Sequence, residues 1–517
     1  MPLQHLLVIY LIGTLLVFLP SFGIARLFTR VNVPAWKAYV PFYNTWIMQG
    51  IAGRPKHWVF WQFIPVVGWF ITPGILIEFA KAFGAFSLRQ HTMASLFGVG
   101  YFPWLASRPG TKFIGPAGVA KHKKKSWREW VDAGIFAVVA ATLIRTFVFE
   151  AYTIPSGSME KTLLVHDFLF VSKISYGPRI PNTPLSVPFV HNYLPITDTK
   201  SYSTLIELPY IRWFASSPKR GDVVVFNFPA GDTVIHAAGF ESFNPYLDIK
   251  RRADRGSQND RAILADPDQY PIVVHPPDKT DNYIKRCVAV AGDSLQIIDG
   301  NVYVNGQIQT PPANSERNYI VETNNNFQIS KEYLDGLGIQ VIESISETGN
   351  SSDLTPIGPN TYLLNMTLHE KELLQTSGVA KSINPLLEKN PDFNRIFPFD
   401  QQHAWAIDSF GPVWIPKKGA ILQLTTDNFS IYERAIRVYE HNDFYQDKGK
   451  FFLNGKETTQ YTFKMDYYWM MGDNRHGSQD SRFWGFVPED RIVGKASMIW
   501  FSWDGGPRWS RLFNFVK

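Results

Sequence analysis

Residues 154–163 place small hydroxyl residues, a glycine and a proline in an order that suits nucleophilic catalysis. Pro155 fixes its own φ angle, and Gly157 lets the backbone turn tightly and approach a ligand closely. This predicts that Ser158 projects into a cleft, with the Ser156 hydroxyl and backbone N–H groups beside it. An acyl-transfer nucleophile needs such a hydroxyl, with hydrogen-bond donors where an oxyanion forms. Because Ser-Gly-Ser also occurs in ordinary loops, the stretch becomes informative only together with two motifs far downstream.

A second motif, at residues 281–294, offers a base for this serine. Tyr283 and Ile284 begin a stretch of strand composition that contains two adjacent cations, Lys285 and Arg286. Side chains alternate along a strand, so the two cations point to opposite faces and one of them faces inward. A free lysine, with a pKa of about 10.4, is protonated at neutral pH, but burial lowers that pKa by up to roughly 3–5 units. Lys285, beside apolar neighbours, is therefore the candidate general base.

The third motif, at residues 471–488, packs polar residues beside an aromatic and apolar strand. A dense group of Asp, Asn, Arg and Ser typically holds a loop together by hydrogen bonds and ion pairs. We expect this structural role for Asp480 and Arg482. Ser478 is the residue of this motif that we place in the site.

Two histidines near these motifs leave a Ser-His-Asp triad as an alternative. His476 sits in a tight polar turn, and His166 follows Ser158 by only eight residues, so lysine is favoured as the base. Metal catalysis is not expected, because no His-Glu-x-x-His occurs and Cys287 is the single cysteine. We therefore predict chemistry without a cofactor or a metal ion.

The composition separates a membrane part from a soluble part. The chain has 517 residues, a net charge of +6 and a mean hydropathy of -0.12, but its first 150 residues are apolar and aromatic. At about 100–200 residues per domain, this length predicts two to four domains. Much of the positive charge lies in short basic patches beside apolar runs, which is typical of cytoplasmic loops of membrane proteins. We expect membrane lipid as a partner and no nucleic acid.

Four apolar runs are long enough, or nearly so, to cross a membrane as helices: residues 6–25, 58–77, 91–107 and 130–149. The third run is the shortest and contains two glycines and a proline, so three or four spans are expected. A cleavable signal peptide is disfavoured for the first run, which has no basic segment before it. Loops rich in Lys and Arg separate the first run from the second and the third from the fourth. The positive-inside rule then places residues 150–517 on the outer side of the membrane.

The remaining sequence indicates a mainly β domain. A short apolar strand is expected at residues 168–171, and the pair Asp299-Gly300 predicts a tight hairpin. Thr367 and Glu370 fit a capping box, so a helix is expected to begin there. The predicted fold class is a mainly β catalytic domain with an inserted second subdomain, behind N-terminal α-helical transmembrane segments.

The predicted domains follow from these patterns. They are a membrane region with about three helices (1–126), a final transmembrane helix (127–149), the first part of the catalytic β core (150–310, with an insertion at 230–282), an inserted accessory subdomain (311–465) and the last part of the core (466–517).

The three motifs, in this order and behind an apolar segment, resemble those of bacterial type I signal peptidase, the leader peptidase of the S26 family with a Ser/Lys dyad. Four blocks carry the resemblance: residues 145–163, 219–228, 283–293 and 472–488. The chain departs from the family pattern at His476-Gly477, where an Asp-Asn pair is more familiar, and in its several spans and large insertions. The resemblance implies the signal-peptidase β fold and the removal of signal peptides from exported preproteins.

By this resemblance, Ser158 is the nucleophile, and Lys285 is the base that later passes the proton to the leaving amine. The Ser158 N–H and the Ser156 hydroxyl would form the oxyanion hole. The supporting residues would be Ser478, which holds the lysine amine, and the ion pair of Asp480 with Arg482.

Further residues match positions that line the shallow substrate pockets of the family: Ile154, Met159, Leu163, Tyr283 and Ile284. Those pockets admit small residues, typically alanine, at the first and third positions before the cut. The preprotein would bind as an added strand. The implied partners are signal peptides, membrane lipid and the secretion translocon. The implied location is the inner (plasma) membrane, multi-pass, with the catalytic domain on the periplasmic side.

Two other classes of protein remain as alternatives. Another Ser/Lys protease, such as a self-cleaving repressor, shares the β core but needs a cytosolic DNA-binding domain where this chain has apolar runs. A catalytically inactive, membrane-anchored binding module is disfavoured because both Ser158 and Lys285 are present.

Overall fold

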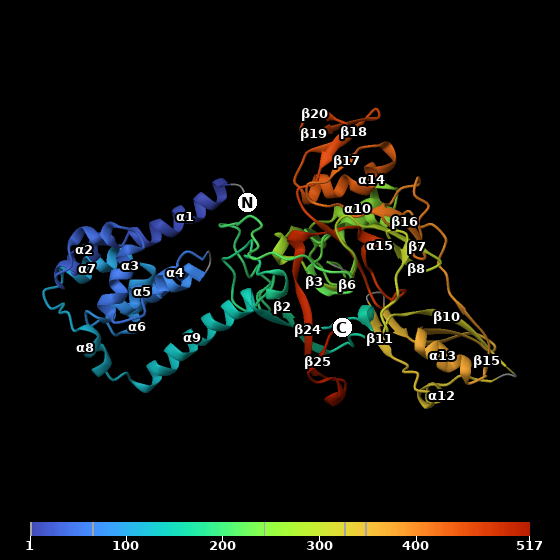
Figure 1. Cartoon of the computed structure of the whole chain (residues 1–517), viewed down its shortest axis with the longest axis horizontal. Coiled ribbons are helices and arrows are strands. Elements are labelled where there is room, and N and C mark those ends of the chain that lie inside the picture. The colour runs from blue at the N-terminus through green and yellow to red at the C-terminus, as the bar shows by residue number, and fades with distance from the viewer. Residues whose placement is uncertain (1–2, 65–66, 242, 325–326, 347–348) are drawn as a thin grey trace. The chain divides into compact units, whose positions relative to one another are not determined.

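The computed structural model describes residues 3–64, 67–241, 243–324, 327–346 and 349–517. The chain divides into two compact units, which are described separately (Figure 1). The first unit comprises Met1–Phe147 with Arg179–Arg212, and the second comprises Val148–Pro178 with Trp213–Lys517.

The first unit is helical. Its helices are α1 (Leu3–Phe18), α2 (Ser21–Thr29), α3 (Tyr43–Ala52), α4 (Trp58–Trp61), α5 (Val67–Lys81), α6 (Leu88–Leu96), α7 (Gly98–Ser107), α8 (Gly115–Lys121) and α9 (Ser126–Phe147). Its apolar core contains Phe28, Phe79 and Phe102. The ring centroid of Phe79 lies 5.8 Å from that of Phe28 and 6.0 Å from that of Phe102. Asn44 is buried beside this core, and its amide donates to the backbone oxygens of Val17 and Ala38, at 3.1 Å each.

One helix of the described residues, α9, is long and apolar enough to cross a membrane, judged by length and composition. It has 22 residues, and none of its most apolar stretch is buried. The predicted fourth span therefore begins earlier, at Ser126, and ends at Phe147, because Phe149 already belongs to a strand.

The first three predicted spans are not continuous helices. Pro20 precedes the start of α2 and separates it from α1, and Phe97 separates α6 from α7. Between α4 and α5, residues 62–64 form turns and a bend, and residues 65 and 66 lie outside the described residues. The prediction of several transmembrane helices is therefore not confirmed, because each of these runs is broken into shorter helices.

The second unit is built on an eight-stranded antiparallel sheet. Seven strands follow the order β1-β2-β24-β3-β6-β22-β23, and β25 pairs with β24. Their bounds are β1 (Phe149–Thr153), β2 (Asp167–Ser172), β3 (Val223–Asn227), β6 (Asn282–Ala289), β22 (Tyr467–Met471), β23 (Val487–Pro488), β24 (Ile492–Ser502) and β25 (Asn514–Phe515). The predicted strand at 168–171 is β2. Since β6 lies between β3 and β22, Lys285 on it pairs with Val224 and Arg286 pairs with Met471.

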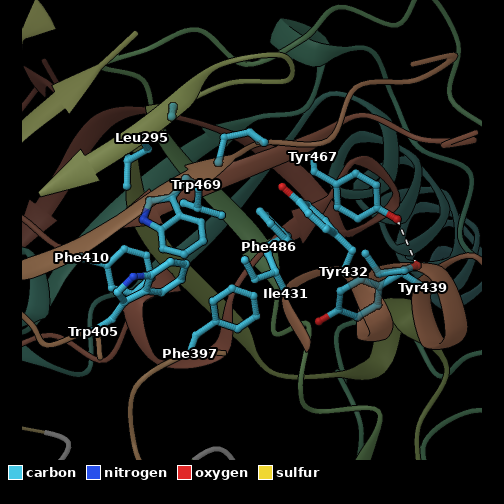
Figure 2. Packing of buried hydrophobic residues seen from close by; sticks show 14 of the residues in the cluster. Leu295, Phe397, Trp405, Phe410, Ile431, Tyr432, Tyr439, Tyr467, Trp469 and Phe486 are labelled. Atoms are coloured by element: carbon cyan, nitrogen blue, oxygen red, sulfur yellow. Dashed lines mark hydrogen bonds between the residues drawn. The ribbon is translucent and has the colours of Figure 1, made fainter. Parts of the chain in front are cut away.

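A large aromatic core supports β22 (Figure 2). Trp469 of β22 lies 5.3 Å from Phe410 and 5.7 Å from Phe486, measured between ring centroids. The Phe486 ring in turn stacks on Tyr432 at 5.7 Å. This packing holds both ends of the loop that follows β22.

Further elements of the second unit contribute to that core. They are β7 (Ser294–Ile298), β8 (Asn301–Val304), β16 (Ser409–Trp414), β17 (Ile421–Gln423), α14 (Thr426–Arg434), a π-helical turn η5 (Ala435–Tyr439), β18 (Phe444–Asp447), β19 (Lys450–Leu453) and β21 (Gln460–Thr462). The strand β9 (Gln307–Ile308) pairs with β8, and β20 (Lys456–Thr458) pairs with β19. The predicted hairpin at Asp299-Gly300 joins β7 to β8 and has positive φ angles at both residues, 52° and 73°. A type I′ turn requires those angles.

Residues 316–385 pack around an apolar cluster of their own. The sheet order is β13-β14-β10-β15, with β10 (Glu316–Thr323), β13 (Leu354–Gly358), β14 (Thr361–Thr367) and β15 (Ala380–Pro385), and the helices are α12 (Lys331–Gly336) and α13 (Leu368–Thr376). A short ladder joins β11 (Glu343–Ser346) to β12 (Gly349–Ser352). The capping box of Thr367 and Glu370 starts α13, as predicted. The stretch 311–465 is therefore shared between two cores, since residues 396–463 pack in the large aromatic core.

The polar stretch 230–282 folds into two helices and a two-stranded ladder. They are α10 (Tyr246–Asp254), α11 (Gln258–Ala265), β4 (Thr233–Ile235) and β5 (Ile272–Val274). Short helical turns complete the unit: η2 (Gly157–Met159), η3 (Ile174–Tyr176), η4 (Pro277–Lys279), α15 (Ser481–Trp484), η6 (Glu489–Arg491) and η7 (Trp509–Arg511).

Candidate active site

Ser158 and Lys285 meet in the second unit, although 127 residues separate them. Ser158 lies on the η2 turn, in the connection between β1 and β2, and Lys285 lies on β6. The lysine Nζ is 2.6 Å from the serine Oγ and donates to it. Ser158 is 3% exposed and Lys285 is 1% exposed. The serine is thus buried in this structure, where an exposed hydroxyl in a cleft was expected.

The β1–β2 connection is closed at its base by two backbone hydrogen bonds. Ile154 N–H donates to Asp167 O, and His166 N–H donates to Ile154 O, both at 2.9 Å. The Asp167 carboxylate also accepts from the N–H of Leu164 at 2.8 Å. These bonds fix the turn that carries Ser158 relative to the strands. We name residues 154–166 the nucleophile loop.

Both cations of β6 are buried, whereas the sequence predicted one inward side chain. Arg286 donates to both carboxylate oxygens of Asp473, at 2.7 and 2.6 Å. The Asp473 carboxylate also accepts from the Thr162 hydroxyl at 2.7 Å. Asp473 therefore connects β6, the nucleophile loop and the segment after β22. The sequence did not single out Asp473 or Thr162, although Asp473 lies in the polar third motif and the adjacent cations of β6 indicate a need for a carboxylate partner.

Residues 472–482, named here the β22 loop, lie directly against the nucleophile loop. Asn474 N–H donates to Ser158 O at 3.2 Å, and the Asn474 amide donates to Gly157 O at 3.3 Å. A Cβ atom on Gly472 would lie 2.5 Å from Ser158 O and 2.3 Å from Ser478 Oγ. Only a glycine permits this close approach.

Ser478 is buried beside the nucleophile loop, but the expected bond to the lysine is not formed. Its Oγ has no hydrogen-bond partner among the described residues. Ser156 is half-buried in extended backbone immediately before η2. The structure thus brings Ser156 and Ser478 to the neighbourhood of Ser158.

Asp480 and Arg482 form a buried bidentate ion pair. Arg482 Nε and Nη2 donate to the two carboxylate oxygens at 2.9 and 2.8 Å. Burial raises the pKa of Asp480, but the charge and hydrogen bonds of Arg482 outweigh it and hold the pKa below its ordinary value. Asp480 also accepts from Gly472 N–H at 3.1 Å, and Arg482 donates to Arg475 O at 2.6 Å. The pair therefore fastens both ends of the β22 loop.

His476 is paired with a carboxylate, yet its ring is not directed at Ser158. Its Nδ1 accepts from Asn318 N–H at 3.2 Å, so Nε2 carries the proton and donates to Asp408 at 3.0 Å. Burial raises the pKa of Asp408, and the contact with His476 lowers it below its ordinary value. With both ring nitrogens engaged, His476 anchors the β22 loop, and His166 is exposed. These positions do not support a Ser-His-Asp triad.

The residues expected to line substrate pockets lie in two apolar clusters. Ile154, Met159 and Leu163 are buried in one cluster, against which half-buried Ile284 packs. Tyr283 belongs to the neighbouring cluster and stacks on Phe228 with centroids 4.6 Å apart. The centre of its ring lies 5.3 Å from Lys285 Nζ.

A mainly β domain that brings a buried lysine amine to a serine hydroxyl has the arrangement of a Ser/Lys hydrolase. The sequence comparisons identify a peptidase family. Residues 127–341 and 422–503, together more than half of the chain, match the family Signal peptidase, peptidase S26. The chain therefore belongs to the peptidase S26 family, and it is a hydrolase of the serine endopeptidase type. Residues 36–116 match a family of unknown function, DUF5684.

Several similar proteins carry the name signal peptidase I. The protein from Haemophilus influenzae is 26% identical over 393 residues, which cover 74% of this chain and 75% of that protein. The protein from Buchnera aphidicola subsp. Schizaphis graminum is 25% identical and covers 72% of this chain and 76% of its own. The protein from Pseudomonas aeruginosa is 23% identical over a stretch that covers 78% of this chain and 82% of that protein.

Proposed function

We propose that this chain removes N-terminal signal peptides from exported preproteins, with Ser158 as nucleophile and neutral Lys285 as general base. The observation that carries the proposal is the buried contact of 2.6 Å between Lys285 Nζ and Ser158 Oγ. The relatives named signal peptidase I support the choice of substrate. Burial disfavours the charged form of a lysine, so the amine is more readily neutral here than in water.

The reaction proceeds through an acyl-enzyme. Lys285 Nζ takes the hydroxyl proton of Ser158 while Oγ bonds to the carbonyl carbon at the cut. The resulting oxyanion is bound by the Ser158 N–H and the Ser156 hydroxyl. When the C–N bond breaks, the lysine ammonium returns the proton to the leaving amine, and the mature protein departs. Water then attacks the ester with the same amine as base, which frees the signal peptide and restores Ser158.

The specificity follows from the apolar residues beside the nucleophile. Met159 and Leu163 follow Ser158 in the nucleophile loop, and Ile154 and Ile284 lie in the same apolar cluster. We assign them to pockets that admit alanine at the first and third positions before the cut. We assign a supporting role to Asp480, Arg482 and Ser478. They hold the β22 loop in place, and this loop limits the space available to the Lys285 side chain.

The proposal predicts one cut in a preprotein whose signal peptide ends in Ala-x-Ala. The full chain in detergent is incubated with this preprotein, and the new N-terminus is identified by mass spectrometry. We expect a cut directly after the second alanine. In a second substrate, phenylalanine replaces this alanine, and kcat/KM is expected to fall by about a hundredfold or more, because a small pocket excludes a large ring. Equal cleavage of the two substrates would refute the pocket assignment.

We further propose that the second unit lies on the outer side of the membrane, behind α9 and close to lipid and the secretion translocon. The basic residues 121–125 precede α9 directly and favour a cytoplasmic start of this helix. In sealed inside-out vesicles, residues 150–517 are then protected from added protease. Their digestion without detergent would place the second unit in the cytoplasm instead.

A further inference from the structure

Lys161 lies three residues after Ser158 and is buried among carboxylates from another part of the second unit. Its Nζ is 2.6 Å from Glu370 Oε2, 3.3 Å from Glu316 Oε2 and 3.8 Å from Asp353 Oδ2. The side chains of all four residues are at most 9% exposed. Glu316 is the first residue of β10, Glu370 lies on α13, and Asp353 precedes β13. Lys161 therefore joins the nucleophile loop to the small sheet of residues 316–385, named here the β10–β15 subdomain.

We propose that Lys161 is a positioning residue, which anchors the nucleophile loop to the β10–β15 subdomain and so holds Ser158 against Lys285. The inference rests on the proposed role of Ser158 as nucleophile. It gives the β10–β15 subdomain a function in catalysis through its contacts with the loops around the reacting atoms.

The backbone at Lys161 needs such an anchor. Its φ angle is +62°, in the left-handed region that non-glycine residues seldom adopt. A conformation of this kind persists where the surrounding structure enforces it. The ion pairs of the side chain supply that restraint on one side, and the bond from the Thr162 hydroxyl to Asp473 supplies it on the other.

The β10–β15 subdomain also holds the β22 loop. Glu316 N–H donates to Asp473 O at 2.9 Å, and Arg475 N–H donates to Glu316 O at 3.0 Å. The Asn365 amide donates to Asn474 Oδ1 at 3.2 Å. Because this subdomain has its own apolar core, it provides a single stable support for both loops around the Ser158–Lys285 pair.

The charges of the cluster do not balance unless some carboxyl groups are protonated. One carboxylate oxygen from each of Glu160, Glu316 and Asp353 lies within 4.8 Å of the others, and Glu370 faces Lys161 as well. Burial raises the pKa of Asp353 to about 6 and that of Glu316 well above its ordinary value. Burial lowers the pKa of Lys161, but the carboxylates outweigh this and raise it, so the lysine stays charged.

The contacts within the cluster assign different roles to the acids. Glu370 makes the shortest contact with Lys161, and its Oε2 also accepts from the N–H of Thr367, the residue that caps α13, at 2.8 Å. Glu316 differs, because burial raises its pKa well above its ordinary value and so favours its neutral form.

The test compares Lys161→Met with a matched variant, Lys173→Met. Lys173 is also a partly buried lysine of the second unit, 2.8 Å from Glu150, but it lies after β2, outside the nucleophile loop. We expect Lys161→Met to lower kcat by about ten- to a hundredfold, because small misplacements of reacting groups are costly. KM changes by less than about threefold, since Met159 and Leu163 keep their apolar neighbours. Lys173→Met keeps the wild-type kcat.

A double variant keeps a loss of folding apart from a loss of positioning. Lys161→Met leaves the Glu370 charge buried without its cation, which destabilises the fold. The double variant Lys161→Met/Glu370→Gln removes that charge, so its thermal midpoint recovers while kcat stays low.

Several results would overturn the inference. A double variant with wild-type kcat, or a kcat of Lys173→Met that falls as far as that of Lys161→Met, means that Lys161 only stabilises the fold. Loss of wild-type activity in EDTA, restored by Ca²⁺, means that the carboxylates hold a metal ion instead. The proposed function is tested separately: an active Ser158→Ala variant refutes it, whereas an inactive Ser158→Ala with a fully active Lys161→Met refutes only the role of Lys161.

Discussion

Replacement of Ser158 by alanine is expected to abolish cleavage of an Ala-x-Ala preprotein while the protein stays folded. The hydroxyl is the atom that forms the acyl-enzyme, and loss of a serine nucleophile typically lowers kcat by roughly a millionfold. The substitution removes one oxygen atom from a buried turn whose backbone is fixed by Asn474 and by the closure of the nucleophile loop. Cleavage rates are measured by gel and mass spectrometry, and folding by the thermal midpoint.

The same variant is expected to retain substrate. The pocket residues Met159 and Leu163 are unchanged, so the signal peptide binds and is held without reaction. Binding is measured with a labelled signal peptide and the detergent-solubilised chain. Gly336→Ala, in open space on α12, serves as the control for folding and for full activity. A Ser158→Ala variant that cleaves at the wild-type rate would remove Ser158 from the mechanism.

Replacement of Lys285 by methionine or by arginine is expected to abolish cleavage equally. Methionine fills a similar volume but has no amine. Arginine keeps a positive charge but is not deprotonated in proteins, so it cannot accept the proton of Ser158. Loss of activity in both variants therefore separates a base from a merely positive group, and proton transfer alone typically contributes about 10²–10⁴-fold.

The pH profile of the wild-type chain gives a second measure of the same step. The neutral amine is the active form, so kcat/KM rises with pH and reaches a plateau when Lys285 has lost its proton. Burial disfavours the ammonium, so the midpoint is expected below the value of about 10.4 for a free lysine. An active Lys285→Arg variant, or a rate that is independent of pH in this range, would contradict the role of Lys285.

Local signals in the sequence predicted local structure well. Two adjacent residues predict the turn at Asp299-Gly300, and four consecutive residues, from Thr367 to Glu370, predict the capping box. Neither prediction needs a partner that is distant in the sequence. The three motifs of the site were found for a similar reason, because each is a short stretch with an unusual composition. The apolar neighbours of Lys285 predicted its burial, whereas alternation along β6 did not predict that Arg286 is buried as well.

Other features depend on partners far away in the sequence. Lys161 and Glu370 are 209 residues apart, and Arg286 and Asp473 are 187 apart, so no window of sequence contains both members of either pair. The burial of Arg286 was missed because its carboxylate partner lies in another motif. Hydropathy predicts a span for each of the first three apolar runs, because it averages over the breaks between their helices, such as those at Pro20 and Phe97.

The most direct test of the central claim replaces the amine at position 285 by one of lower basicity. Cys287 is the single cysteine and is buried, so a Cys287→Ala parent lets a Lys285→Cys variant be alkylated selectively with 2-bromoethylamine. Alkylation restores a side chain with the length of lysine, in which sulfur lowers the pKa of the amine. We expect the unalkylated variant to be inactive, alkylation to restore cleavage, and the midpoint of the pH profile to move to lower pH than in the parent. Restored cleavage with an unchanged midpoint, or cleavage before alkylation, would contradict a proton transfer from Ser158 to the neutral amine of Lys285.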